Sequence, residues 1–195
     1  CRTQLRQMTQ GGSPRVLFAP YRICPIGAHI DHQGGTVLGQ AIDVGTTLAF
    51  VPDDRPSLRL RSANYPDEVH VDLRQKEAPD TLWGRYVWAA ARACEDHLPR
   101  TARGLQGAVE GSLPGGGLSS SASFLIALQS ALLSINEVEL SPMQRVRIAR
   151  RAENEFVGLA CGILDQASIL GARKGHLLSI DANQETWQPI APGPG

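Results

Sequence analysis

Three glycines, three serines and a long apolar segment constrain this chain more than any other stretch. The segment reads Ser112-Leu-Pro-Gly-Gly-Gly-Leu-Ser-Ser-Ser-Ala122, and the residues that follow predict a helix that is apolar nearly all round and therefore buried. The first turn of such a helix carries free backbone N–H groups and the positive end of the dipole, and glycines let a phosphate approach the backbone. We favour an anion site over a glycine-rich turn before a core helix. The stretch is not a P-loop, because it lacks both Gly-Lys-Ser/Thr and G-x-G-x-x-G.

The composition is that of a globular protein without a strongly charged partner. Hydrophobic residues make up 42% of the 195 residues, which is enough for a packed core. The 19 basic and 19 acidic residues cancel, and no basic block stands out. Nucleic acid and anionic membrane are therefore not expected partners. No apolar run reaches about 18 residues, so no transmembrane helix is expected.

The cysteines and the chain ends give two further expectations. Cys1, Cys24, Cys94 and Cys161 have neither C-x-x-C nor zinc-ligand spacing. Scattered cysteines of this kind, without a signal-peptide pattern, favour reduced thiols in a cytoplasmic protein. Because the chain begins with Cys and ends in Ala-Pro-Gly-Pro-Gly, we expect a fragment of a longer protein. The sequence does not predict the oligomeric state.

Periodicity and turn residues predict an α+β fold. Strands are expected at residues 16–19, 37–41, 46–51, 58–61, 69–73, 105–109 and 175–180, and helices at 82–98, 118–135, 141–157 and after 161. Along the chain, most of the expected strands come first and most of the helices follow, with one early helix between the strands. This order favours a mostly antiparallel sheet with helices packed on one face. Ser141-Pro-Met-Gln144 predicts a capping box. Residues 1–14 are expected to be a flexible lead-in, 15–182 one domain, and 183–195 a linker or a cut end.

Residues 20–35, rich in proline and glycine, concentrate side chains that could do chemistry. They include Arg22, His29, Asp31 and His32, and loops with such side chains often carry function. The alternative is a surface loop whose histidines and aspartate make turn hydrogen bonds. The residues alone do not decide between the two.

Glu153 is a carboxylate on the apolar face of a predicted helix. Helical spacing places it on the same face as Val146, Ala149 and Phe156. A carboxylate there costs on the order of several kcal/mol unless it is paired or binds a metal. Several arginines are near in sequence, so an ion pair and a metal site both stay open.

Asp165 and Trp83 each have an ordinary interpretation beside a functional one. Asp165 lies in the first turn of a short predicted helix, where the helix dipole stabilises a carboxylate. Trp83 shares a helical face with Tyr86 and Val87, and aromatic residues at this spacing are usually core. Stacking of Trp83 on a purine is the minority interpretation from periodicity alone.

Several motifs resemble those of the GHMP small-molecule kinases, and most of all those of the galactokinase branch. Residues 20–32 resemble P-G-R-V-N-L-I-G-E-H-x-D-Y, and residues 115–123 resemble the family's phosphate loop. Residues 152–158 and 161–166 resemble A-E-H-x-x-x-G-x-x-C-G-I-M-D-Q, and Trp83-Gly-Arg-Tyr86 resembles the family's W-x-x-Y helix. The motifs stand in the family's order and together span most of the chain.

The resemblance implies a fold like the second domain of ribosomal protein S5 and a sugar kinase that uses ATP and Mg²⁺. Asp165 would orient or deprotonate the anomeric hydroxyl, and Arg22 would hold Asp165 ionised and stabilise charge on the transferred phosphoryl group. Ser121 and Glu153 would ligate Mg²⁺, which prefers oxygen ligands. The other matches are the triphosphate cradle (Gly115, Gly116, Gly117, Leu118, Ser119, Ser120, Ser121), the adenine side (Trp83, Tyr86) and the sugar pocket (Ala28, His29, Asp31, Gly162).

Ala28 departs from the galactokinase motif, which has a glutamate that holds the sugar's 6-hydroxyl. A carboxylate at this position would repel a substrate with its own carboxylate at C6, so alanine, with an imidazole nearby at His32, suits a uronic acid. Residues 21–35 are also very similar to the plant galacturonokinase motif S-P-Y-R-I-C-P-L-G-A-H-I-D-H-Q-G-G. The resemblance therefore favours galacturonate as substrate and galacturonate 1-phosphate as product.

Other functions stay open beside this one. Galactokinase is the runner-up, and a sugar sensor that binds without turnover is a further possibility, although the matching catalytic and metal positions argue against it. A nucleic-acid module like ribosomal protein S5 is the weakest alternative, because the net charge is zero. The family also has a C-terminal domain of comparable size that closes the cleft, so we expect this chain alone to be nearly inactive.

Overall fold

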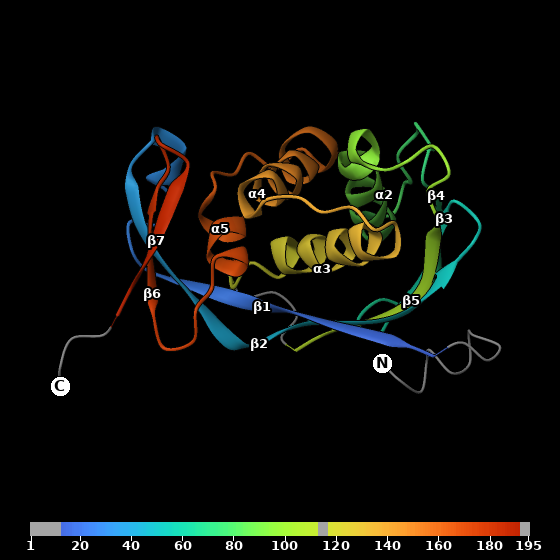
Figure 1. Ribbon diagram of the computed structural model, residues 1–195, viewed down its shortest axis with the longest axis horizontal. Helices are drawn as coiled ribbons and strands as arrows, with labels where there is room; N and C mark the ends of the chain where they lie inside the picture. Colours follow the sequence, from blue (N-terminus) through green and yellow to red (C-terminus); the bar gives the residue numbers. More distant parts are fainter. Residues whose placement is uncertain (1–12, 113–116, 192–195) are drawn as a thin grey trace.

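The structure, a computed structural model, describes residues 13–112 and 117–191. A twisted sheet carries a layer of helices on one face (Figure 1). The strands are β1 (Arg15–Ile26), β2 (Thr36–Asp53), β3 (Ser57–Ser62), β4 (Val69–Asp72), β5 (Gly104–Gly111), β6 (Leu177–Asp181) and β7 (Thr186–Ile190). The helices are η1 (Asp31–Gln33, 3₁₀), α2 (Leu82–Cys94), η2 (Glu95–His97, 3₁₀), α3 (Ser120–Ile135), α4 (Pro142–Arg151), η3 (Ala152–Val157, π) and α5 (Leu164–Leu170). The predicted α+β class, with a mostly antiparallel sheet and helices on one face, is confirmed.

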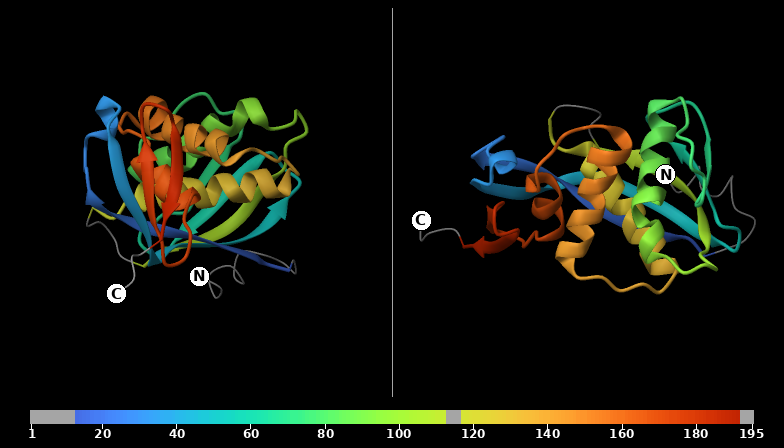
Figure 2. Two further views of the ribbon diagram at one scale, coloured as in Figure 1. Left: turned by 60° about the vertical axis from the view of Figure 1, so that its left-hand side comes forward. Right: turned by 90° about the horizontal axis from the view of Figure 1, so that it is seen from above.

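Strand β2 is the central strand of the sheet because it pairs with three other strands. It runs antiparallel to β1, to β5 from Thr46 to Asp53, and to β6 from Thr36 to Gly39. The order is β4-β3-β5-β2-β6-β7, with β1 beside β2. The β6–β7 hairpin and the β3–β4 pair therefore lie at opposite ends of the molecule (Figures 1 and 2).

Helix α3 lies in the middle of the helical layer and supplies much of the core. Twelve of its 16 residues are buried, as the apolar sequence predicts. Leu125, Leu128 and Leu132 share one core cluster with Leu48 and Phe50 of β2. Each buried leucine contributes about 1.5–3 kcal/mol of transfer free energy. The N-terminus of α3, which follows directly from the serines, is therefore held on a rigid element.

Helix α4 begins as predicted and then changes its geometry. The hydroxyl of Ser141 accepts the backbone N–H of Gln144, and the Gln144 side chain accepts the N–H of Ser141, so the capping box is confirmed. The sequence predicts a regular helix to residue 157, but α4 ends at Arg151 and the π-helix η3 follows. Single π-turns of this kind occur frequently at functional sites, and η3 carries Glu153.

Four segments differ from the sequence prediction. The predicted loop 20–35 is strand as far as Ile26, and the two strands predicted at 37–41 and 46–51 are one strand. Residues 186–190 form β7 rather than a linker, and β3 pairs with β5 in parallel. The cause in each case is pairing with a neighbouring strand, which satisfies the backbone N–H and C=O groups of weakly patterned segments.

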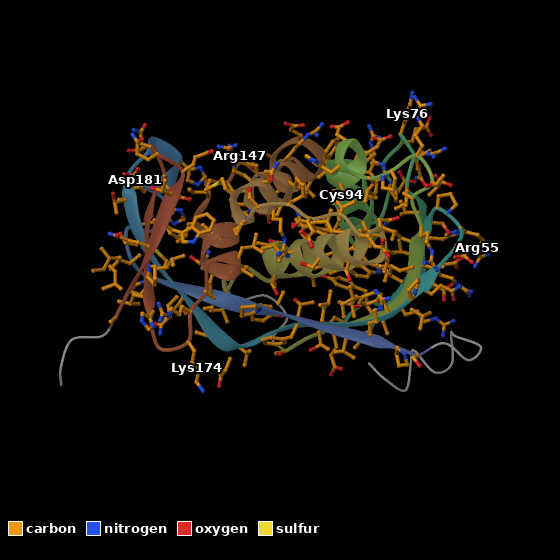
Figure 3. The ribbon with its side chains drawn as sticks, in the orientation of Figure 1. Arg55, Lys76, Cys94, Arg147, Lys174 and Asp181 are labelled. Atoms are coloured by element: carbon orange, nitrogen blue, oxygen red, sulfur yellow. The ribbon has the colours of Figure 1, made fainter. Side chains whose placement is uncertain are left out.

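Many charged side chains lie at the surface of the molecule, and Asp31 and Glu153 are buried exceptions. Arg55, Lys76 and Lys174 lie at the periphery, whereas Cys94 lies within the helical layer (Figure 3). Burial raises the pKa of the Cys94 thiol to about 12. Within the described ranges, no helix has both the length and the apolar character needed to cross a membrane.

Candidate functional site

The segment Gly117–Ser121, called here the serine loop, turns the chain into α3. Gly117 and Ser119 have φ angles of 68° and 59°, in the left-handed region that glycine adopts readily and serine adopts only with strain. Ser119 is the N-cap residue of α3, but its side chain does not cap the helix. The Ser119 hydroxyl has a distant partner instead. Gly115 and Gly116 lie outside the described residues.

The distant partner of Ser119 is Asp165, in the first turn of α5. The Ser119 hydroxyl donates to Asp165 Oδ2 at 2.5 Å, and Nε and Nη2 of Arg22 each lie 2.7 Å from Oδ1. Arg22 also donates from Nη1 to the Gly117 carbonyl at 3.0 Å and from its backbone N–H to the Leu118 carbonyl at 3.2 Å. The side chains of Arg22 and Asp165 are 16% and 22% exposed. Three segments far apart in sequence thus fix one carboxylate and leave it reachable.

Glu153 lies deeper, 3% exposed, and receives hydrogen bonds from neutral groups. The Ser121 hydroxyl donates to its Oε1 at 2.7 Å, and the Gln166 amide donates to its Oε2 at 2.5 Å. The thiol of Cys161 lies 3.5 Å from the same Oε2. Burial raises the pKa of Glu153, and the charge of Asp165 raises it further by a smaller amount. The hydrogen bonds lower this pKa but do not cancel the increase.

The arginines near Glu153 in sequence have other partners. Arg147 and Arg150 bind Glu185 in the β6–β7 turn, and Arg151 binds Asp96 and Glu155. In the part of the chain that the structure describes, no cation pairs with Glu153. The ion-pair interpretation of this buried carboxylate is therefore wrong.

A cavity of about 650 Å³ opens beside Asp165 and is called here the aspartate cavity. Asp31 is 9% exposed in its wall, and its Oδ2 accepts the backbone N–H of Leu164 at 3.1 Å. A Cβ at position 162 would lie 2.0 Å from Asp31 Oδ2, so Gly162 allows α5 and η1 to approach. The lining residues are Arg22, Ile23, Cys24, Ala28, His29, Asp31, His32, Gly117, Leu118, Ala160, Cys161, Gly162, Leu164 and Asp165. The four residues expected for a sugar pocket thus lie together around Asp165.

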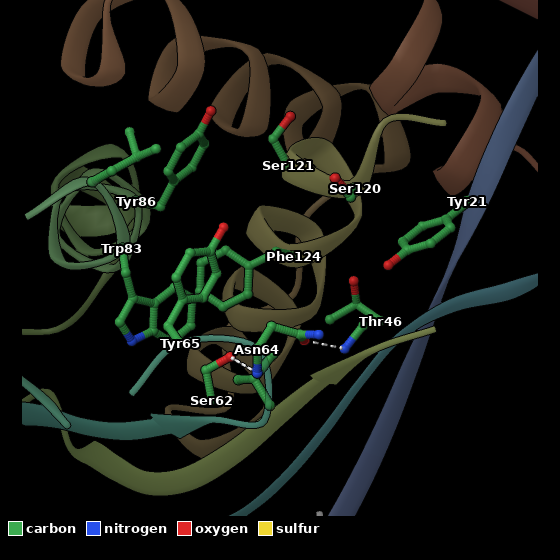
Figure 4. Close-up of a pocket in the computed structure, with 13 residues that line it drawn as sticks. Tyr21, Thr46, Ser62, Asn64, Tyr65, Trp83, Tyr86, Ser120, Ser121 and Phe124 are labelled. Carbon is green, nitrogen blue, oxygen red and sulfur yellow. Dashed lines mark hydrogen bonds between the residues drawn. The ribbon is translucent and has the colours of Figure 1, made fainter. Parts of the chain in front are cut away.

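A second cavity, of about 220 Å³, is called here the aromatic cavity (Figure 4). At one end Tyr65 stacks on Trp83 with ring centroids 5.5 Å apart and an interplanar angle of 6°, and Phe124 lies 4.8 Å from Trp83. At the other end lie the hydroxyls of Tyr21 and Thr46 (Figure 4). The lining residues, none of them charged, are Tyr21, Thr46, Ser62, Asn64, Tyr65, Leu82, Trp83, Tyr86, Val109, Gly111, Ser120, Ser121 and Phe124.

The aromatic residues of this cavity differ in what they offer to a ligand. Trp83 is only 8% exposed, because Tyr65 and Phe124 contact its ring, whereas Tyr65 is 47% exposed. Tyr65 therefore presents more ring surface than the predicted Trp83. Burial first, and then the charge of Glu153, raises the pKa of Tyr86, so its phenol stays protonated at neutral pH.

Two cysteines line the aspartate cavity without being activated. Burial raises the pKa of Cys24, and burial together with the charge of Glu153 raises the pKa of Cys161 to about 12. The nucleophilic form of cysteine is the thiolate. Neither thiol is therefore suited to act as a nucleophile.

The structure brings together most of the residues that the sequence singled out, and it adds others. Sequence reasoning missed Tyr21, Thr46 and Tyr65 in the aromatic cavity and Gln166 beside Glu153. Tyr21 had a signal, because the galactokinase motif has glycine at this position, and Gln166 stands within a quoted motif. Thr46 and Tyr65 gave none, since their roles depend on contacts between separate elements.

Comparison with known proteins gives two family matches. Residues 85–172 match the GHMP kinases N terminal domain, and residues 7–52 match the galactokinase galactose-binding signature. The chain is 39% identical over 189 residues to a galacturonokinase from Arabidopsis thaliana, covering 87% of this chain and 45% of that protein. It is 36% identical over 170 residues to a galactokinase from Thermococcus kodakarensis, covering 85% of this chain and 46% of that protein.

Solved structures agree with these matches. The crystal structure of Lactococcus lactis galactokinase complexed with galactose superposes with a TM-score of 0.86 at 27% identity, covering 91% of this chain and 47% of the other. Methanococcus jannaschii mevalonate kinase, with a TM-score of 0.75 and 23% identity, shares the fold. The chain spans about half the length of the relatives that it matches.

Proposed function

The chain belongs to the GHMP kinases, of which it carries the N-terminal domain and the galactokinase galactose-binding signature, and on this premise we propose that it acts in an ATP-dependent sugar 1-kinase. The observation that carries the proposal is Asp165, fixed by Arg22 and Ser119 where the serine loop borders both cavities. The aspartate cavity would hold the sugar, and the aromatic cavity would hold the nucleoside of ATP.

Asp165 is suited to act on a sugar hydroxyl. Its two oxygens are held by different donors, so the carboxylate has one orientation toward the cavity it lines. It would accept a hydrogen bond from the anomeric hydroxyl, align that oxygen with the phosphorus and take up its proton. Arg22 balances the charge of Asp165 and would stabilise negative charge on the transferred group.

The N-terminus of α3 is suited to receive the phosphates. Gly117 to Ser121 bring backbone N–H groups and hydroxyls to the start of a buried 16-residue helix. Its dipole favours anions at this end. A triphosphate there would run from the aromatic cavity toward Asp165, which is the direction that transfer requires.

Ser121 and Glu153 have the donors that Mg²⁺ prefers. Both offer oxygen, and the buried Glu153 has no cationic partner within the described residues. When bound there, Mg²⁺ would neutralise phosphate charge. Gln166 would keep the second oxygen of Glu153 in place.

We favour galacturonate over galactose as the sugar. Ala28 lines the aspartate cavity and adds no charge, and His29 and His32 bring two imidazoles to the same cavity. Of its two aspartates, Asp165 is paired with the cation of Arg22, whereas Asp31 accepts the Leu164 N–H. A substrate carboxylate would therefore meet one negative charge fewer, at position 28, than in the galactokinase motif.

Kinetics on both sugars test this proposal. The full-length enzyme should turn over galacturonate with a higher kcat/KM than galactose. In it, Ala28→Glu should lower kcat/KM for galacturonate by roughly 100-fold or more, because two carboxylates in a partly dry cavity repel each other by on the order of a few kcal/mol. Ala28→Gln introduces a side chain of the same size as glutamate but without charge, so it is the matched control. It should lower kcat/KM for galacturonate much less than Ala28→Glu does. A wild type that prefers galactose would favour the alternative, galactokinase.

A second alternative is a sugar sensor that binds without turnover. Arg22 is paired with Asp165, and Ser121 donates to Glu153, so the residues expected for catalysis and for Mg²⁺ are all present, which favours an enzyme. Sugar 1-phosphate formed from ATP above the uncatalysed background would exclude the sensor. Binding of both ligands without product would support it.

A further inference from the structure

Tyr21 and Thr46 are buried residues whose hydroxyls have no partner within the described part of the chain. Their exposed fractions are 1% and 2%, and both line the aromatic cavity. The fully buried, unpaired side-chain atoms of the described residues do not include these two oxygens, so each hydroxyl opens into the cavity, where it can bond with water or with a ligand. Two such groups at the same end of one cavity therefore offer hydrogen bonds to a molecule bound there.

Tyr21 lies opposite an irregularity in the pairing of β1 with β2. The pairing passes from Pro20–Gly45 to Arg22–Ala41, so three residues of β2, 42–44, stand opposite Tyr21 alone. Such irregularities change the local twist of a strand pair and are frequent next to active sites. The phenol oxygen comes so close to Gly111 that a Cβ there would lie 2.8 Å from it. Its neighbour Arg22 lines the aspartate cavity instead.

The rest of the aromatic cavity limits the chemistry of the ligand. The lining includes no charged residue, and the end opposite Tyr21 is formed by the rings of Tyr65, Trp83 and Phe124. Such a cavity suits a planar ring with an uncharged, hydrogen-bonding part attached. A nucleoside has this combination, with the base against the aromatic end.

We propose that Tyr21 and Thr46 bind the uncharged polar part of the nucleoside and contribute to nucleotide affinity and selectivity. The inference rests on the proposed function in that it takes the ligand to be a nucleoside. Because the hydroxyls can donate or accept, they could bond with the ribose hydroxyls or with the edge of the base. The ribose and the base edge would form the same kind of hydrogen bond with these hydroxyls, and two ligand analogues distinguish between them.

The experiment measures nucleoside binding and thermal stability in parallel. Tyr21→Phe and Thr46→Val remove one hydroxyl each with little change in shape, and adenosine is titrated by calorimetry. We expect adenosine affinity to fall roughly 3- to 10-fold in each variant. The Tm without ligand should stay the same or rise, because the removed hydroxyl had no protein partner. If the hydroxyls had a structural role, adenosine affinity would stay the same and the Tm would fall.

Ser123→Ala is the matched control. Ser123 is fully buried near the same strand, but its hydroxyl donates to the Ala19 carbonyl at 2.8 Å. Removing it should lower the Tm and leave adenosine affinity unchanged. This contrast separates a hydroxyl that serves the ligand from one that serves the fold.

Two analogues identify the bonded group. If the ribose is the partner, 2′- or 3′-deoxyadenosine should bind wild type more weakly than adenosine and should show no further loss in Tyr21→Phe. If the base edge is the partner, purine riboside, which lacks the exocyclic amine, should bind wild type more weakly than adenosine and should show no further loss in Tyr21→Phe. Unchanged adenosine affinity in both hydroxyl variants would overturn the inference while leaving the kinase proposal intact. A wild type that binds neither adenosine nor a non-hydrolysable ATP analogue would overturn both.

Discussion

At the scale of single residues, Asp165 is the most sensitive point of the proposed chemistry. Asp165→Asn keeps the shape of the side chain but removes the negative charge that would take up the sugar proton. We expect kcat to fall at least about 100-fold while binding of a non-hydrolysable ATP analogue is retained. Asp181→Asn, in the β6–β7 hairpin, is the control and should keep full activity. Near-normal turnover in Asp165→Asn would end the assignment of Asp165 as the base.

Glu153 gives a second prediction at this scale. Glu153→Gln keeps the volume of the side chain but removes the charge that would bind Mg²⁺. The Mg²⁺ concentration for half-maximal activity should rise at least roughly 10-fold. Glu155→Gln, on the same π-helix but paired with Arg151 at the surface, should have no effect on it. If Glu153→Gln lowers only the Tm, Glu153 has a structural role.

At the scale of elements, the approach of α5 to η1 depends on Gly162. In Gly162→Ala the new Cβ would lie 2.0 Å from Asp31 Oδ2, so Asp31 must move and its bond to the Leu164 N–H must lengthen or break. We expect KM for the sugar to rise by roughly 10-fold or more, with little change in KM for ATP. Ala160→Gly, in the same loop, is the control. Equal effects on both KM values would argue against a local cause.

The end of β2 gives a prediction about pH. Asp53 accepts hydrogen bonds from Arg55 and from Gln106 of β5, and these bonds, Arg55 first, hold the pKa of Asp53 well below its usual range. A carboxyl with a lowered folded-state pKa stabilises the fold above its unfolded pKa of about 3.9 and loses this effect as the pH falls further.

Asp53→Asn should therefore cost about 1–2 kcal/mol of unfolding free energy at pH 7, and the difference from wild type should shrink below about pH 4. Urea denaturation at pH 7, 4 and 3 measures it. Asp54→Asn is the control, because the Asp54 side chain is 91% exposed. A pH-independent difference would mean that the charge of Asp53 is not the cause.

The same elements show how far the sequence could predict the structure. The capping box of Ser141 and Gln144 was predictable because it involves residues three apart, and the buried character of α3 follows from its own periodicity. The continuity of β2 was not predictable, because it depends on pairing with the distant strands β5 and β6. Strand β7 and the π-helix η3 were not predictable either, because their own residues carry no clear strand or π-helix pattern. In the site, Arg22 and Asp165 are 143 residues apart, and only the family resemblance linked them. The stacking of Tyr65 on Trp83 had no sequence signal.

At the scale of the whole molecule, the chain has two cavities beside the serine loop but matches only about half of its relatives' length. We expect residues 1–195 alone to bind adenosine but to form sugar 1-phosphate very slowly, because kinase sites need closure to exclude water and to complete the catalytic groups. Calorimetry and a coupled phosphorylation assay measure the two properties. Full specific activity from residues 1–195 would contradict this expectation.

The alternation of Tyr21 and Arg22 along β1 has a consequence for how this protein can vary. One residue lines the aromatic cavity and the next lines the aspartate cavity, so the strand separates the two cavities. Since a shift of one residue turns every side chain of a strand to the opposite face, a single insertion or deletion between Arg15 and Pro20 would exchange the two walls. A change of length in this segment is therefore expected to disturb both cavities at once, and libraries that alter nucleotide or sugar preference should keep its residue count fixed.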